Sequence, residues 1–213
     1  MKEDQKDFLD IIKSYSIVKE YPEQHVLLNP GDRKRTLFYI YYGRVSLSAM
    51  SYDGSTKIIY FLDSDSFICE LDYFLDCAST LVVKTEMPCI LYKIPFKNYD
   101  YLWNNSPIFQ EKIVTTLSKK VHSLQNEISS ISFRSVQHRI LSFLYSIRLE
   151  EKSSDPSWAD LKYNYTQTQL AEIVGSNRAT VNREIAKLCN SGYLRKLNNQ
   201  VQVNIIKKPP NFI

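Results

Sequence analysis

The chain has 213 residues, enough for one large domain or two modest domains that each bury a core. It carries 27 Lys and Arg against 23 Asp and Glu, a formal net charge of +4. The N-terminal segment MKEDQKDFLD mixes acidic and basic residues and leads into no apolar segment, and the purely apolar stretches of the chain are short. These features exclude an export signal and a membrane span, so we expect a cytoplasmic protein without a membrane partner.

Short runs rich in β-branched and aromatic residues fill the chain between Tyr21 and Ile94, at roughly eight- to twelve-residue spacing. The runs are HVLL, TLFYIYY, RVSLSAM, TKIIYFL, TLVVKT and CILYKI. Gly31, Gly43 and Gly54 fall between runs, where a turn needs positive φ, and Asp53-Gly54 is a hairpin signal. The pattern predicts an antiparallel β-roll or sandwich, which we assign to a domain at residues 1–106.

The cysteines, at positions 69, 77, 89 and 189, form no C-x-x-C pair and have no metal-ligand spacing. We therefore expect buried thiols in a reducing compartment. Redox sensing stays open as an alternative.

A long helix is predicted at residues 107–133, beginning near Pro107. Six apolar residues in it are separated by 3, 4, 3, 4 and 3 positions, the a/d pattern of a two-stranded coiled coil: Val114, Leu117, Val121, Leu124, Ile128 and Ile131. The predicted flanking positions are Lys119, Lys120, Gln125 and Glu127. A monomer could bury this seam against its own β domain, but nearly three heptads favour a partner helix and thus a homodimer.

The C-terminal domain is predicted at residues 134–213. Its first helix carries Arg139, Ile140, Phe143, Leu144 and Ile147, and a polar linker, EKSSDPSW, is expected at residues 151–158.

Residues 165–191 predict two short helices joined by a tight turn. Thr166 and Gln169 form a capping box that starts the first helix near Gln167, and Gly175 can end it in a left-handed conformation. Ser176 is the expected cap of the second helix. Its apolar stripe pushes polar residues outward, and the two sets are Val181, Ile185 and Leu188 against Asn177, Arg178, Asn182, Arg183 and Lys187. The motif is typical of a helix-turn-helix that places its second helix in the DNA major groove. An ordinary helical hairpin with a solvated basic face is the alternative.

Two further observations favour DNA binding. Val201, Val203 and Ile205 alternate with polar residues after an Asn198-Asn199 turn, which predicts the hairpin of a winged helix-turn-helix. From residue 161 to 213 there are eight Lys or Arg against two Glu, a balance of +6, so the remainder of a +4 chain carries about −2. A basic excess confined to one domain is the electrostatic footprint of a phosphate-binding surface.

A β-roll, a long helix and a C-terminal winged helix in this order resemble the Crp/Fnr superfamily of bacterial transcription regulators. The most specific motifs are NPGD at 29–32, FYIYYGRV at 38–45, FICEL at 67–71 and QLAEIVGSNRATVNREIAKL at 169–188. The resemblance implies an α+β fold with a cyclic-nucleotide-binding-like roll. It also implies a homodimer on a palindromic operator in double-stranded DNA, with RNA polymerase as a partner and an effector bound between roll and long helix.

The resemblance also assigns roles in DNA recognition. Base contacts fall on Arg178, Ala179, Asn182 and Arg183, and phosphate contacts on Thr166, Gln167, Ser176, Asn177 and Thr180. Ala179 stands where many relatives carry a glutamate that accepts from cytosine N4. A methyl group accepts nothing, so we expect a different preference at that base pair.

The sensor departs from the cyclic-nucleotide pattern. Glu70 is retained, but Cys69 replaces the preceding glycine, and Ser79 and Thr80 stand where an Arg-Ser pair holds the cyclic phosphate. Without a cation that phosphate would be buried unpaired, so cyclic AMP is not the expected effector. Alignment brings seven residues toward the pocket: Tyr60, Glu70, Leu71, Ser79, Thr80, Leu124 and Gln125.

Aromatic residues crowd the roll, and they suggest a small aromatic effector like that of the chlorophenol-responsive, CprK-like branch, although most of these rings are expected in the core. They are Tyr39, Tyr41, Tyr42, Tyr60, Phe61, Phe67, Tyr73 and Tyr92. There is no N-terminal four-cysteine set for an iron-sulfur cluster, and His25, His122 and His138 are too scattered for haem. A cupin-like metalloenzyme would need clustered ligands, so enzyme activity is not expected. A dimeric DNA-binding protein whose roll binds no ligand is the other alternative.

Overall fold

The computed structural model describes residues 2–150, 155–197 and 200–207, and for residues 2–6 the backbone alone. The chain divides into two compact units, Met1–Gln125 and Asn126–Ile213, which are described separately. In the described part of the chain, no helix has the length and apolar character needed to cross a membrane.

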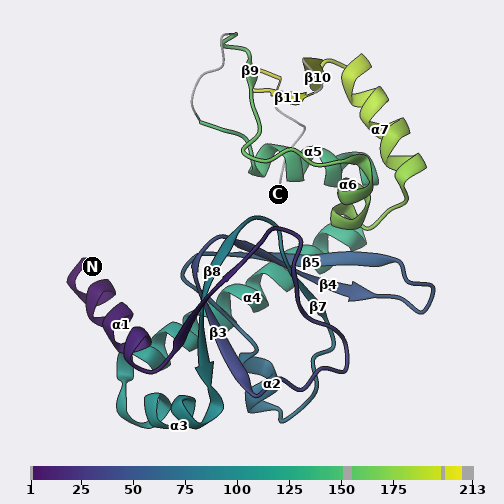
Figure 1. The fold of residues 1–213 in the computed structure, drawn as a ribbon. Coiled ribbons are helices and arrows are strands. Elements are labelled where there is room, and N and C mark those ends of the chain that lie inside the picture. Colours follow the sequence, from purple (N-terminus) through teal and green to yellow (C-terminus); the bar gives the residue numbers. More distant parts are fainter. Residues whose placement is uncertain (1, 151–154, 198–199, 208–213) are drawn as a thin grey trace. The chain divides into compact units, whose positions relative to one another are not determined.

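The first unit is built on two antiparallel four-stranded sheets (Figure 1). One has the order β1-β8-β3-β6, formed by Ile17–Tyr21, Cys89–Pro95, Thr36–Tyr42 and Ser66–Ile68. The other has the order β2-β7-β4-β5, formed by Val26–Leu28, Val82–Thr85, Arg44–Met50 and Thr56–Asp63. The six predicted runs are all strands; β1 and β6 lie outside those runs.

Strand β3 shows why a continuous apolar run folds as a strand here. Phe38 and Ile40 enter the core between the two sheets, whereas Leu37 and Tyr39 enter a second core on the other face. Successive side chains of a strand point to opposite faces, so a strand covered on both sides needs apolar residues at every position.

The second core lies under helices α1 (Lys2–Ser14), α3 (Phe96–Asn105) and α4 (Pro107–Phe133). Helices α1 and α3 and the short α2 (Glu70–Phe74) lie outside the predicted elements. Helix α4 has the bounds expected from the heptad pattern.

Helix α4 presents two different faces. Phe109, Ile113, Thr116 and Lys120, spaced by 4, 3 and 4 positions, are its buried residues. Lys120, predicted at a position that flanks the seam, directly precedes Val121 and also belongs to this buried face. The seam residues are 54%, 54%, 37%, 65% and 50% exposed at Val114, Val121, Leu124, Ile128 and Ile131, and Leu117 is partly buried.

In the residues of the second unit that the structure describes, three helices follow the end of α4, and a small antiparallel sheet has the order β10-β11-β9 (Figure 1). The helices are α5 (Val136–Ser146), α6 (Gln167–Val174) and α7 (Arg178–Asn190), and the strands are β10 (Leu194–Leu197), β11 (Gln200–Asn204) and β9 (Trp158–Ala159). The wing strands pair as predicted, while the Asn198-Asn199 turn lies outside the described residues.

Two local predictions about this unit need correction. Trp158 does not belong to a linker, because it pairs with Asn204 as the start of β9, and residues 151–154 lie outside the described part. The predicted alternation of Val201, Val203 and Ile205 does not describe the burial of β11, whose buried residues are Gln202 and Val203. Gln202 can be buried because its side-chain amide accepts from Arg195 and donates to Asp160, so its hydrogen bonds are made within the protein.

Candidate functional site

The helix-turn-helix is set by local hydrogen bonds. The Thr166 hydroxyl accepts from Gln169 N at 3.2 Å, and Gln169 Oε1 accepts from Thr166 N at 2.8 Å, which is the predicted capping box. Gly175 ends α6 in the left-handed conformation at φ 62°. The cap of α7 is Asn177, not Ser176, because Asn177 Oδ1 accepts from Thr180 N at 2.8 Å.

Helix α7 separates a buried stripe from a polar face. Val181, Ile185 and Leu188 are buried, whereas Arg178, Ala179, Asn182 and Arg183, assigned to bases, are all exposed. Glu184 accepts from Lys187 at 2.8 Å and lies 3.5 Å from Arg183 Nε, and these contacts hold its pKa below the ordinary value. The Arg183 side chain is still 66% exposed, so its guanidinium faces solvent.

The residues assigned to phosphates are in different situations. Asn177 is exposed, and Ser176 and Thr180 are half-buried at the turn and the first turn of α7. The Thr166 hydroxyl is engaged in the capping box, and Gln167 is the first residue of α6. They therefore surround the start of the two helices, where free backbone N–H groups favour an anion.

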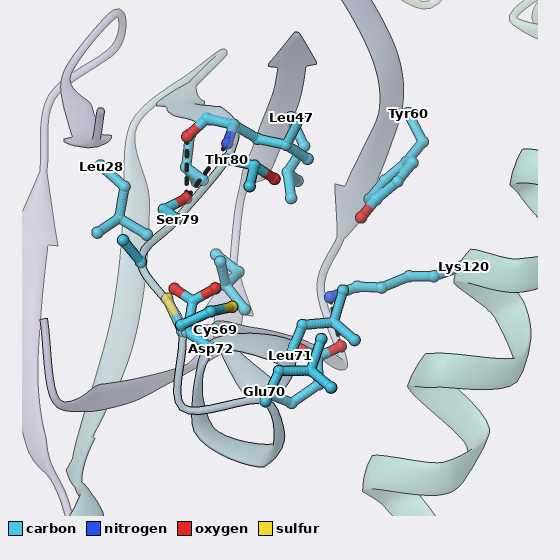
Figure 2. A pocket seen from close by; sticks show the side chains of 16 residues that line it. Leu28, Leu47, Tyr60, Cys69, Glu70, Leu71, Asp72, Ser79, Thr80 and Lys120 are labelled. Carbon is cyan, nitrogen blue, oxygen red and sulfur yellow. Dashed lines mark hydrogen bonds and ion pairs between the residues drawn. The ribbon is translucent and has the colours of Figure 1, made fainter. Parts of the chain in front are cut away.

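In the first unit, a cavity of about 140 Å³ opens between α2, the segment before β7, strands of the β2-β7-β4-β5 sheet and α4 (Figure 2). Five of the seven residues expected at the effector site line it: Tyr60, Glu70, Leu71, Ser79 and Thr80. Leu124 and Gln125 are not among its lining residues, because both are exposed on α4 beyond Lys120.

Glu70 and Lys120 form a buried ion pair in the wall of this cavity. The Lys120 ammonium donates to Glu70 Oε1, and the two side chains are 6% and 1% exposed for Lys120 and Glu70 respectively. The second carboxylate oxygen, Oε2, is buried and has no hydrogen-bond partner. The pair links α2 to α4 across 50 positions of sequence.

Sequence reasoning missed Lys120 as a cavity residue. Its signal is the second stripe of α4, because Phe109, Ile113 and Thr116 lead to it at helical spacing. The heptad seam is the longer apolar pattern in α4, and it indicates a different set of residues.

Cys69 occupies a conformation that suits glycine. It is the residue before α2, with φ 76° and ψ 12°, and it is buried against the core between the sheets. A side chain here therefore stands at the cavity wall where a glycine would leave space. Burial and the charges of Asp72 and Glu70 raise the pKa of the thiol, so it stays protonated.

The other polar groups of the cavity are already constrained. The Ser79 hydroxyl donates to Leu81 O at 3.0 Å and lies 3.4 Å from Leu81 N, so it closes a local turn (Figure 2). Burial, followed by the charge of Glu70, raises the pKa of Asp72 above its ordinary value. The same two causes raise the pKa of Tyr60 to about 12.

The aromatic residues of the roll mostly serve the core. Of the eight rings considered, Tyr60 lines the cavity, while Tyr39, Phe67 and Tyr92 are buried in the second core. Tyr73 packs against that core, Phe61 lies under Arg44, and Tyr41 and Tyr42 are 44% and 52% exposed. Alternating strand positions explain this distribution, because one face of the β1-β8-β3-β6 sheet is covered by helices.

Metal-ligating side chains are dispersed. Among residues 2–150, 155–197 and 200–207, no three His, Cys, Asp or Glu side chains gather in a way that could hold a metal ion. The four cysteines form no disulfide; Cys69 and Cys89 are buried, and Cys77 and Cys189 are partly buried.

Two family models match the chain. One describes a cyclic nucleotide-binding domain and matches residues 18–106. The other describes a Crp-like helix-turn-helix domain and matches residues 138–208. The matches cover the β-roll and the region that includes α6, α7 and the wing.

Two curated relatives align with most of this chain. The cAMP-activated global transcriptional regulator CRP of Pasteurella multocida is 24% identical over 182 residues, covering 84% of this chain and 86% of that protein. The CRP-like protein Clp of Xanthomonas campestris pv. campestris is 27% identical over 188 residues, covering 85% of this chain and 81% of that protein.

Solved structures agree on the fold. The c-di-GMP responsive global regulator CLP of Xanthomonas campestris superimposes with a TM-score of 0.84 at 24% identity, covering 93% of this chain and 99% of that one. CprK in complex with OCPA superimposes with a TM-score of 0.69 at 18% identity, covering 92% and 91%. The fold is therefore shared with proteins whose names state different ligands.

Proposed function

We propose that this chain is a transcription regulator of the Crp/Fnr type, which acts as a homodimer on a palindromic operator and responds to a small-molecule effector other than cyclic AMP. Matches to a cyclic nucleotide-binding domain at residues 18–106 and to a Crp-like helix-turn-helix domain at residues 138–208 support the family. The family accounts for a cyclic nucleotide-binding-like domain and a helix-turn-helix DNA-binding domain. The dimer, the operator contacts, RNA polymerase as a partner and the nature of the effector are the parts proposed.

The observation that carries the DNA-binding proposal is the polar face of α7. Its buried stripe packs inside the domain, so Arg178, Asn182 and Arg183 face outward together. Two guanidinium groups on such a face are suited to the O6 and N7 acceptors of guanine. The basic balance of this domain favours approach to the phosphate backbone.

The exposed seam of α4 supports the homodimer. The alternative was that a monomer buries this stripe against its own roll, yet the roll takes the face of Phe109, Ile113 and Lys120 instead. Apolar residues in heptad spacing that remain outside the core are suited to a second copy of the same helix. A two-fold dimer would present two recognition helices to a palindrome.

The cavity supports an effector other than a cyclic nucleotide. No arginine is among its lining residues in the described part of the chain, and Cys69 takes up room beside Glu70. A cavity of about 140 Å³ is close to the roughly 150 Å³ that accommodates a benzene-sized molecule. A small effector, aromatic or otherwise mainly apolar, therefore suits this space better than a nucleotide.

Selection of bound DNA from random oligonucleotides tests the operator. We expect a palindrome whose half-site shows no cytosine requirement opposite Ala179. In A179E the added carboxylate should accept from cytosine N4 and create that requirement. If wild-type protein already selects the same base as A179E, the assignment of Ala179 to a base pair is wrong.

Charge removal tests the recognition face. R178A/R183A should lose specific retention of the selected operator by at least about tenfold, since each good bidentate contact is worth about 1–3 kcal/mol. K19A/K97A removes the same charge from exposed positions of the roll and serves as the matched control. Equal retention by the two double variants would contradict the proposal.

A further inference from the structure

The cavity beside α2 contains more negative than positive charge. Of the described residues that line it, Glu70 and Asp72 are acidic and Lys120 alone is cationic. Lys120 already donates to Glu70 Oε1, so its charge is neutralised inside the wall. The basic run from Arg33 to Arg35 lies outside this cavity. It lines a separate depression of about 30 Å³ together with Asp72 and Asp76.

An acceptor without a donor is present at the same place. Glu70 is fully buried, and its carboxylate oxygen Oε2 has no hydrogen-bond partner. A buried carboxylate oxygen gains from a hydrogen-bond donor and loses from a second negative charge. Figure 2 shows the Lys120 side chain reaching toward Glu70 next to Leu71, and Leu28 and Leu47 are apolar lining residues drawn farther from the pair.

An anionic ligand would have to separate the buried pair. It would take Lys120 as its counter-charge and leave Glu70 close to Asp72 without one. Other groups that interact with Glu70 give no compensation, because Tyr60, Tyr99 and the Cys69 thiol are uncharged at neutral pH. A neutral or cationic donor can instead bind Oε2 and leave the Lys120 contact in place.

We propose that this cavity takes a non-anionic effector of about one ring in size, whose hydroxyl, amide N–H or ammonium group donates to Glu70 Oε2. The inference rests on the proposed function, because it names the ligand class of the sensor site. Alcohols, amides and amines belong to the class, whereas carboxylates and phosphate esters do not. The ion pair with Lys120 then connects the bound group to α4.

Calorimetric titration of the full-length protein at pH 7.5 tests the class with three compounds of matched shape: benzyl alcohol, benzylamine and benzoate. We expect benzyl alcohol or benzylamine to bind at least tenfold more tightly than benzoate. Cyclic AMP is a fourth titrant and should bind no better than benzoate. This comparison uses the unaltered protein, so it does not depend on whether a variant folds.

Two variants locate the effect. E70Q removes the charge but keeps the shape, and it should reduce the preference for benzylamine over benzoate by at least tenfold. E86Q is the matched control, because Glu86 is an ion-paired carboxylate of the same roll that accepts from Ser46 and does not line the cavity. E86Q should retain the wild-type ranking.

The proposal is overturned if benzoate or cyclic AMP binds as tightly as the donors. It is also overturned if neither donor binds at concentrations up to about 10 mM, or if E70Q and E86Q behave alike. Operator retention is measured separately without any compound. A protein that retains DNA but prefers benzoate contradicts the ligand class alone. A protein that binds benzyl alcohol but never retains DNA contradicts the proposed regulator instead.

Discussion

Cys69 is the residue at which the β-roll differs most plainly from the cyclic-nucleotide pattern, in which a glycine precedes the glutamate. Its φ of 76° lies in the region where a Cβ is strained, yet its side chain is buried in the core between the sheets. The left-handed conformation is therefore a property of the backbone turn into α2, which persists without glycine. The thiol adds packing and reduces the space next to Glu70.

C69G and C69A separate strain from packing. Both remove the thiol, but only glycine relieves the positive φ, so C69G should be more stable than C69A by about 1 kcal/mol. Urea unfolding gives the difference. Cys89, in strand β8, supplies the control: C89G should be less stable than C89A, because an extended residue gains nothing from lacking Cβ.

Asp72 carries a cost when it is ionised. Burial and the charge of Glu70 raise its pKa above 3.8, so the folded state holds this proton more tightly than the unfolded state. Stability is then lost as pH rises from 3.8 through the raised pKa. D72N should melt at a higher temperature than wild type at pH 7, and the difference should close toward about pH 4. A D72N gain that is equal at both pH values would exclude this origin. D10N, at an exposed carboxylate of α1, is the control.

Helix α4 carries two stripes of residues with different roles. One stripe completes the second core and ends in the Lys120 contact with α2, while the other remains exposed in heptad spacing. A second ion pair, Lys112 Nζ to Asp65 Oδ2 at 2.6 Å, ties the same helix to the turn before β6. Charged anchors thus hold the roll-facing side of the helix and leave its seam available.

The Glu70–Lys120 contact should behave as a buried pair. K120M leaves the Glu70 charge without its counter-charge and should destabilise the protein by about 3 kcal/mol or more. Adding E70Q to K120M removes that charge and should recover most of the loss. Chemical unfolding of the two single variants and the double variant measures the coupling. Additive losses would show that the contact contributes little.

At the scale of the whole molecule, association is expected to depend on the seam. V121E/I128E places charges at two positions that are 54% and 65% exposed in one chain. Sedimentation should show monomers, and operator retention should fall because two linked recognition helices no longer bind together. The unfolding of each domain should change little. T115E/S129E introduces the same charges at exposed positions away from the seam and should stay dimeric. A V121E/I128E dimer would contradict the proposed interface.

Local sequence by itself determined the DNA-reading unit and most strands. The capping box, the Gly175 turn and the stripes of α6 and α7 act within a few positions, so the chain shows them directly. The α7 cap moved by one residue, and Trp158 and the buried positions of β11 differ from the prediction as described above. The glycine turns of the roll are equally local, and at Gly43 an added Cβ would collide with Cys89 Sγ.

Tertiary structure alone decided the character of the sensor site. Helices α1, α2 and α3 lie outside the elements predicted from the sequence, and the heptad seam of α4 drew attention away from its second, buried stripe. Glu70 and Lys120 are 50 positions apart, and their pairing depends on how α4 packs against the roll. Such a contact leaves no pattern along the chain, because its energy comes from burial and charge that exist only once distant segments have met.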